Sequence, residues 1–392
     1  MTGKQRIRAA MRHEPVDRVP VMCQLAIGHY LLNTDVKPAE LWFTSEGFVA
    51  ALIALARRYD FDGILLNLSG RDPGWMRYAS RIDSAADGGQ IVHFTNGDRA
   101  LCPPDDNVQH IHQSGYRRPT LDEVDPGRLF YDDPHDMGGL KYPFYFGFDP
   151  PAADCVDRWP DYIFRLLELA KPLVGEELSV HAEIFSPFTQ LMELLGYPQA
   201  LMGLIDQPEK CEAILAAYTE GAADLGQKMA QRGADAVLIS SAFAGGGFIS
   251  PRQYDRFVLP YEAEVVRCVH EAGAPVYTHT CGCIGDRLER MVETGTDGID
   301  TLDPPPLGNV DLADGKRRVG EKVFFKGNID SVNTLLKKSQ SEVKADAIER
   351  LKIGSRGGGY ILSSACSVSP RVPPENLAVL SEASKEFGTP CG

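Results

Sequence analysis

Short apolar runs alternate along this chain with longer stretches in which apolar residues recur at helical spacing. The runs are rich in Val, Ile and Leu and show no strict alternation with polar residues. This pattern is typical of parallel strands that are covered on both faces. It predicts eight strands, which lie at residues 18–27, 62–68, 177–184, 234–241, 274–279, 297–302, 322–328 and 358–364.

The stretches between these strands carry the start and stop signals of helices. One predicted helix, 208–233, opens with a proline and closes with a glycine, and another, 250–273, opens with Ser-Pro. Eight strands that alternate with helices close most economically into a (β/α)8 TIM barrel, with an open doubly wound sheet as the alternative. No Gly-x-Gly-x-x-Gly follows the first strand, so the usual signal of a dinucleotide-binding sheet is missing. We predict a single α/β barrel domain over residues 1–392.

One long segment, residues 71–159, interrupts the alternation between the second and third strands. Its part 86–104 has the pattern of a β-hairpin, and its part 141–162 is aromatic and rich in proline. Inserts of this size on a barrel generally decorate the catalytic mouth. We therefore predict a lid or a partner surface here, with a plain stabilising excursion as the alternative.

Bulk composition narrows the classes of partner. The chain has 40 Lys and Arg residues against 54 Asp and Glu residues, and its formal net charge of -14 repels phosphate backbones and anionic lipids. No apolar run approaches the length of a membrane span, and residues 1–20 contain no apolar signal-like segment. Nine cysteines, an odd number spread over a long chain, favour reduced thiols over a disulfide framework. We expect a cytoplasmic protein that binds neither nucleic acid nor membranes.

A histidine and two thiols mark the end of the fifth predicted strand, in the stretch "VYTHTCGCIG" (276–285). Barrel enzymes carry their chemistry at the carboxyl ends of strands, and at a frayed strand end His279 and Cys281 can point the same way. Cys366 lies just beyond the eighth strand, and the rim of a barrel brings all strand ends around one opening. Imidazole and thiolate are preferred donors to Zn²⁺, and three protein ligands leave a fourth position open, as in catalytic zinc sites.

Two alternatives stay open at this stretch. The first is a turn or a buried strand end that contains thiols without any metal. The second is that Cys283, which has the same parity as Cys281, replaces it as a ligand. We rank Cys283 lower because the following "GCIGDRLERM" has the pattern of the next helix.

Five motifs follow one another along the chain: "RIRAAMRHEPVDRVPV" at the start, "ISPRQYDRFVLPY" before the fifth strand, "HTCG" at its end, "KGNID" at the seventh strand and "CSVSPRVPPENL" after the eighth. In this order they resemble the uroporphyrinogen decarboxylase superfamily, and within it the zinc-dependent methyltransferases that work with corrinoid proteins. Carried over by residue, the resemblance implies that His279, Cys281 and Cys366 bind zinc.

Departures from the decarboxylase branch decide between the two branches. That branch needs no metal and binds an acidic tetrapyrrole through an arginine-bearing motif after the first strand. Here that place reads "MCQLAIGHY", which has no arginine and presents His29 as a candidate cofactor-binding residue. The decarboxylase also has no use for Cys366. The methyltransferase is therefore favoured, a metal-independent decarboxylase of a carboxylated substrate is the alternative, and a non-catalytic metal- or corrinoid-binding module is a third interpretation.

The resemblance implies methyl transfer between a small substrate and the cobalt of a corrinoid. The substrate is either a methyl ether or amine donor or a thiol acceptor, and both directions stay open. Eight strands and one insert leave no room for a corrinoid-binding domain, so a partner protein is expected to carry the corrinoid. Whether the chain works alone or as a homodimer also stays open. An aryl or apolar donor is slightly favoured by aromatic residues of the insert, although core packing explains them equally well: Tyr142, Phe144, Tyr145, Phe146 and Phe148.

Polar residues at other strand ends are candidates for supporting roles. Glu183, at the end of the third strand, is a candidate fourth ligand or proton acceptor. Asp300 and Asp303 flank the end of the sixth strand and are alternatives to it. Asn328 ends the seventh strand, where an amide can hold the substrate or orient a ligand. Each of these carboxylates has a plainer explanation as a solvated or capping group.

Overall fold

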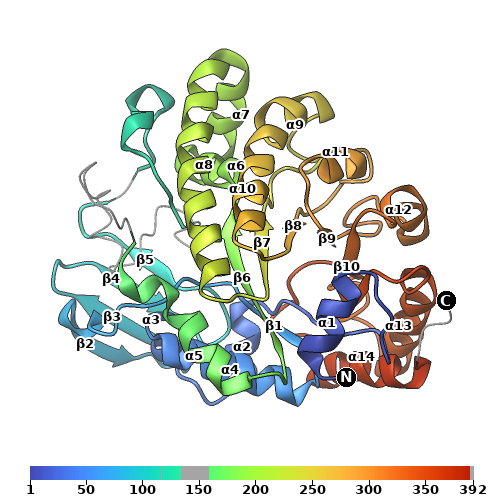
Figure 1. The fold of residues 1–392 in the computed structure, drawn as a ribbon. Coiled ribbons are helices and arrows are strands. Elements are labelled where there is room, and N and C mark those ends of the chain that lie inside the picture. The colour runs from blue at the N-terminus through green and yellow to red at the C-terminus, as the bar shows by residue number, and fades with distance from the viewer. Residues whose placement is uncertain (116, 134–158, 389–392) are drawn as a thin grey trace.

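The computed structural model describes residues 1–115, 117–133 and 159–388, and the fold in these ranges is α/β (Figure 1). Its centre is a curled sheet of seven parallel strands, in which each strand pairs with the next one along the chain. All seven are buried except for two positions near the end of one strand, as expected for strands that are covered on both faces. The strands are β1 (Gly63–Leu66), β6 (Ser179–Phe185), β7 (Ala236–Ser240), β8 (Val276–His279), β9 (Gly298–Thr301), β10 (Phe324–Ile329) and β11 (Tyr360–Ser364).

Seven of the eight predicted strands are thus confirmed, and the first one differs. Segment 18–27 makes two isolated parallel bridges to β11 and the segment after it, between Val21 and Leu362 and between Leu25 and Val368. Its Val21 N–H donates to the side chain of Asp62 at 2.8 Å instead of to a backbone carbonyl. A side chain therefore interrupts the ladder, and the closed eight-stranded barrel stays a prediction.

Helices follow the strands and cover the sheet (Figure 1). The predicted helix at 250–273 is two helices, because Pro260 lacks an N–H and its ring excludes a continuous helix through Val258. Among the described residues no helix has the length and apolar character that a membrane crossing requires. The helices are α1 (Gly3–Met11), α2 (Ile27–Asn33), α3 (Pro38–Phe43), α4 (Ser45–Arg58), α5 (Arg165–Val174), α6 (Pro187–Leu195), α7 (Tyr197–Asp206), α8 (Pro208–Gln231), α9 (Pro251–Phe257), α10 (Leu259–Glu271), α11 (Leu288–Glu293), α12 (Leu312–Val319), α13 (Gln340–Gly354) and α14 (Pro374–Phe387).

Helix α1 packs against β1, β6 and β11 and joins one face of the curled sheet in a compact apolar cluster. Alternate residues of a strand share a face. The residue two positions after each strand residue of this cluster therefore lies on the same face of the sheet, nearer to the carboxyl end of its strand. There the apolar side chains give way to polar ones. The cluster consists of Ile7, Ala10, Met11, Met22, Leu65, Ala236, Leu238, Tyr277, Phe324 and Ile361.

The described part of the 71–159 insert forms a second, antiparallel sheet with the strand order β2-β3-β4-β5, at the lower left of Figure 1. Strands β3 (Gln90–Phe94) and β4 (Arg99–Cys102) pair as the hairpin predicted for 86–104, with β2 (Ala79–Ser84) and β5 (Gln109–Ile111) at the edges. The predicted aromatic side chains at 142–148 lie outside the described residues. The lid or partner role of the insert stays a prediction.

Candidate metal centre

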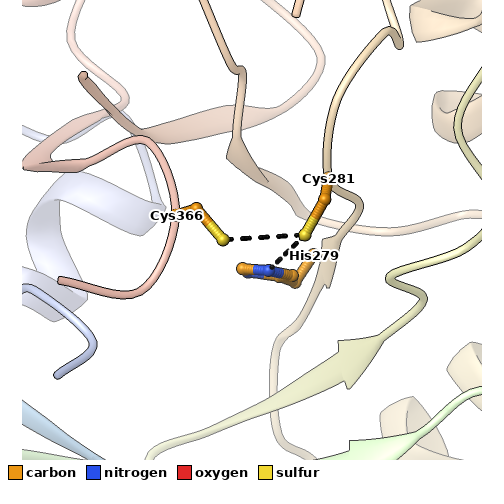
Figure 2. A group of neighbouring side chains, drawn as sticks. All are labelled: His279, Cys281 and Cys366. Atoms are coloured by element: carbon orange, nitrogen blue, oxygen red, sulfur yellow. Dashed lines mark hydrogen bonds between the residues drawn. The ribbon is translucent and has the colours of Figure 1, made fainter. Parts of the chain in front are cut away.

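His279, Cys281 and Cys366 lie together at the carboxyl ends of the parallel strands (Figure 2). The Sγ atom of Cys281 is 3.4 Å from Nε2 of His279 and 3.6 Å from Sγ of Cys366. All three donor atoms are within 4.8 Å of one another. Ligands of a tetrahedral zinc ion are separated by about 3.6 Å for nitrogen to sulfur and about 3.8 Å for sulfur to sulfur. The donor set and its spacing therefore fit a zinc ion.

Strand register places a carboxylate directly behind the imidazole. In the parallel ladder His279 pairs with Asp300, and Asp300 pairs with Lys326, all on the face that continues Tyr277 and Phe324. His279 Nδ1 is 3.0 Å from Oδ2 of Asp300, and Lys326 Nζ donates to the other carboxylate oxygen at 3.0 Å. The carboxylate thus hydrogen-bonds to Nδ1, and Nε2 faces the sulfurs. An imidazole that binds a metal is commonly oriented in this way.

The buried ion pair between Lys326 and Asp300 affects the protonation of the row formed by His279, Asp300 and Lys326. Burial alone would raise the pKa of Asp300, but the charge of Lys326 and the hydrogen bond with His279 outweigh it and lower the pKa to about 2. Burial likewise acts to lower the pKa of His279, whereas Asp300 and Cys366 raise it to about 10. The carboxylate therefore stays ionised, which keeps it a strong hydrogen-bond acceptor for the imidazole.

The pKa values of the two thiols are shifted in opposite directions, which favours a protonated Cys281 and a Cys366 thiolate. Their mutual hydrogen bond is the largest cause of both shifts: it raises the pKa of Cys281 well above its usual value and lowers that of Cys366 well below it. His279 also stabilises the Cys366 thiolate through a hydrogen bond and its charge. The thiolate is the form of cysteine that binds metals, and the cationic imidazole stabilises it until metal binding displaces the imidazole proton.

Loops after the strands bring the cysteines to the imidazole. Ala365 N–H donates to the carbonyl of Ile329 at 2.7 Å, which extends the β10–β11 ladder and sets the position of Cys366. On the other side, Gly282 has φ +76° and donates its N–H to Asp303 Oδ2 at 2.7 Å, which shapes the turn after Cys281. Burial raises the pKa of Asp303 to about 6.

The other predicted site residues take different positions. Asn328 is fully buried, and its side-chain amide donates to the carbonyl of Leu302 at 2.9 Å. Glu183 is half-buried on β6 and Cys283 is half-buried after β8, and neither belongs to the group of donor atoms within 4.8 Å. The cluster in the described chain thus contains Cys281 and not Cys283. Whether Glu183 and Asn328 act in catalysis stays a prediction.

His29, the candidate cofactor-binding residue, is buried away from solvent. Its Nδ1 is 3.0 Å from the carbonyl of Pro370, and its Nε2 is 2.8 Å from the hydroxyl of Tyr59. Burial lowers the pKa of His29 to about 4. Both ring nitrogens therefore already have protein partners, and contact with a cofactor stays a prediction without support from this arrangement.

The sequence prediction did not include Lys326. The signal was present in "KVFFKGN", because a lysine within an apolar strand is rare unless it is paired. Its partner could not be identified from the chain, since Asp300 lies on another strand and only the register joins the two.

Comparison with known proteins shows to which protein family this chain belongs. The family model of uroporphyrinogen decarboxylase (URO-D) matches residues 151–387, so the chain belongs to the uroporphyrinogen decarboxylase family. This confirms the superfamily that the motifs resemble.

Individual relatives within this family differ in how much of this chain they match. Over 387 residues, which are 98% of both chains, this chain is 24% identical to the Methylcobamide:CoM methyltransferase MtaA of Methanosarcina barkeri. It is 33% identical over 232 residues to uroporphyrinogen decarboxylase of Prochlorococcus marinus, covering 57% of this chain and 63% of that enzyme. A solved structure titled "methyltransferase from Methanosarcina mazei" superposes with a TM-score of 0.69 at 20% identity and covers 99% of each chain. The full-length likeness to a methyltransferase, in line with the predicted branch, indicates an enzyme.

Proposed function

We propose that this chain transfers a methyl group between a small substrate and the cobalt of a corrinoid carried by a partner protein, with zinc held by His279, Cys281 and Cys366. One observation carries the proposal: an imidazole nitrogen and two sulfurs from distant segments gather within 4.8 Å at the strand ends. The full-length similarity to a methylcobamide:CoM methyltransferase supports it.

The donor set suits a reactive site rather than a closed structural one. Three protein ligands leave a coordination position for the substrate, whereas structural zinc sites use four. When bound, zinc supplies positive charge that favours the thiolate form of a substrate thiol or stabilises the leaving oxygen or nitrogen of a methyl ether or amine. Both directions of transfer remain compatible with these residues.

The surrounding residues hold the imidazole in place. Asp300 accepts a hydrogen bond from Nδ1 of His279, so Nε2 is the nitrogen that faces the thiols and that would bind the metal once it has lost its proton. Lys326 neutralises the carboxylate from the far side, which keeps Asp300 ionised while it is buried. We therefore assign Asp300 as a positioning residue, in place of the direct catalytic role that its strand-end position suggested.

Asn328 is a candidate for contact with the substrate or a bound water. Its Nδ2 is used by the carbonyl of Leu302, while its buried Oδ1 has no hydrogen-bond partner in the described part of the chain. A buried acceptor without a partner is costly, and a substrate or water that donates to it would remove the cost.

An anaerobic spectral assay tests the proposal. We expect cob(I)alamin to convert to methylcobalamin with a methoxylated aromatic or methylamine donor, or methylcobalamin to lose its methyl group to a small thiol. Cys366→Ser should lose bound zinc and at least about 100-fold in rate, since loss of a ligand costs more than the 10- to 100-fold typical of an outer-shell change. Cys283→Ser is the matched control on the loop of Cys281, and it should retain both properties. Equal rates and zinc contents for the two variants would refute the proposal.

A metal-independent decarboxylase is the alternative function, and the 33% identity to uroporphyrinogen decarboxylase favours it. Zinc content separates the two functions. Purified protein that was never exposed to chelator should hold about one equivalent of zinc if His279, Cys281 and Cys366 bind it tightly, and less than about half an equivalent would favour the decarboxylase. Metal binding without any turnover, unchanged by Cys366→Ser, would instead point to a non-catalytic module.

A further inference from the structure

A second group of metal-ligating side chains lies in the antiparallel sheet of the insert, and the proposed function does not use it. It consists of Asp98, at the turn between β3 and β4, and of His110 and His112, in and just after β5. One ligand atom from each lies within 4.8 Å of the other two. The side chains of Asp98 and His110 are buried, and that of His112 is 15% exposed.

The hairpin register explains why these three side chains meet. In the β4–β5 ladder Arg99 pairs with Ile111 and Ala100 pairs with His110. Continued by one step, this antiparallel register sets Asp98 opposite His112. Residues two apart in a strand share a face, so Asp98, His110 and His112 all belong to the face of buried Ala100. A His-x-His pair opposite a carboxylate is thus built into adjacent strands.

The distances fit a shared ion better than two strong hydrogen bonds. Nε2 of His110 and Nδ1 of His112 are both 3.3 Å from the same carboxylate oxygen, Oδ2 of Asp98. Charge-assisted hydrogen bonds are typically about 2.7–2.9 Å long. Donors that lie about 2.0–2.1 Å from a common tetrahedral ion are about 3.3 Å apart. Two imidazole nitrogens converging on one oxygen at this separation therefore mark out ligand positions.

Surrounding contacts hold the three groups in orientation. The other carboxylate oxygen of Asp98 accepts the backbone N–H of Gln113 at 2.9 Å, and Asn96 Nδ2 donates to Oδ2 at 3.1 Å. The imidazole of His110 stacks on buried Phe94 at 5.4 Å between centroids and on His112 at 4.7 Å. Ligands whose positions are set in advance bind a metal with a smaller loss of conformational freedom.

We propose that Asp98, His110 and His112 form a second site, for a first-row transition-metal dication of the Zn²⁺ type. Two of the three donors are imidazole nitrogens, which favour such ions over Mg²⁺ and Ca²⁺. The ion ties the β3–β4 turn to β5, a three-residue edge strand that its backbone pairing alone holds weakly. The site is independent of the proposed methyl transfer.

Metal titration of the whole protein tests the site, with Zn²⁺ and Co²⁺ as probes. Wild type should bind two equivalents, and Co²⁺ should give one phase with sulfur-to-metal charge-transfer bands and one with ligand-field bands alone. His112→Ala should remove the second phase and weaken that binding by at least about 100-fold, since it removes a direct ligand. His93→Ala is the matched control, because His93 lies in the same sheet and faces the carboxylate of Asp83 at 2.9 Å. It should retain both phases.

The outcomes also separate this site from the first one. Cys366→Ser should remove the charge-transfer phase and leave the other unchanged. Wild type that binds only one equivalent, lost in Cys366→Ser and kept in His112→Ala, would overturn the second site. A single equivalent lost in His112→Ala would support it while refuting the first. Circular dichroism of each variant checks folding, and a misfolded His112→Ala is replaced by His112→Gln, which lacks an imidazole but keeps a polar side chain.

Discussion

Asp300 has a specific part at the scale of single residues: it decides which nitrogen of His279 faces the two thiols. It can do so because strand register sets the two residues side by side, with Lys326 on the far side of the carboxylate. A buried charge with partners on both sides is costly to change, since removing one partner leaves the other uncompensated. This makes the row a sensitive place to test the metal proposal.

Asp300→Asn should weaken zinc binding by about 10- to 100-fold, because the amide loses the charge that orients and polarises the imidazole. Competition with a chromophoric chelator measures the affinity. Rates should recover when zinc is raised to saturation, a response that mere misfolding would not give. Asp297→Asn is the control, since Asp297 is 2.7 Å from another histidine, His270, and lies before β9 rather than at its carboxyl end. An unchanged affinity in Asp300→Asn would contradict the positioning role.

At the scale of elements, loops rather than strands complete the candidate site. The glycine run after β7, which reads "AGGGF" in the sequence, packs against the loop of Cys281 and Cys283. Gly246 donates its N–H to the carbonyl of Cys283 at 2.7 Å. A Cβ atom added to Gly245 would stand 2.5 Å from the carbonyl oxygen of Cys281, which no real contact allows. The glycine is therefore required by close approach of two backbones.

Gly245→Ala should displace the Cys281 carbonyl and reduce zinc affinity and rate together. We expect a loss on the order of 10-fold, comparable with other changes that support a metal ligand indirectly. Gly247→Ala is the matched control, since a Cβ at that position meets nothing within 4 Å. Metal content and the spectral assay are the measurements. Equal behaviour of the two alanine variants would show that the loop adapts without cost.

At the scale of the whole molecule, one buried carboxyl group makes stability depend on pH. Glu262 on α10 is fully buried near Ser241 and Tyr254, and burial raises its pKa from 4.5 to about 7. The folded state therefore binds more protons than the unfolded state between these values. Its contribution to stability is full below pH 4.5 and is lost as the pH rises to about 7. The total loss is about 3 kcal/mol.

Glu262→Gln should remove this loss, because the amide carries no ionisable proton. Urea unfolding at pH 5 and pH 8 measures it: the variant should gain about 2.5 kcal/mol relative to wild type on going from pH 5 to pH 8. Glu209→Gln is the exposed control, with a side chain that is 83% exposed, and should show no such gain. A wild type and variant whose stabilities change in parallel with pH would contradict the assignment.

Local patterns in the sequence were sufficient for most elements. Strand and helix positions depend on residues near one another in the chain, so seven strands appear where the apolar runs predicted them. The prediction of one continuous helix at 250–273 was wrong for a reason that is also local, since Pro260 lies within the predicted helix in the sequence. The first strand differs because Asp62 takes the N–H of Val21, a contact that depends on tertiary structure.

The sequence by itself determined the residue types of the candidate centre and the rim to which they belong, because parallel strands bring their carboxyl ends together. The tertiary structure alone decided that Asp300 and Lys326 form a row behind His279 and that the histidines of the insert meet Asp98. The physical reason is that these relations depend on register and loop path, which join residues far apart in the chain. Metal coordination requires donor atoms to lie within a few ångströms of one another, and the spacing of residues along a sequence does not specify such distances.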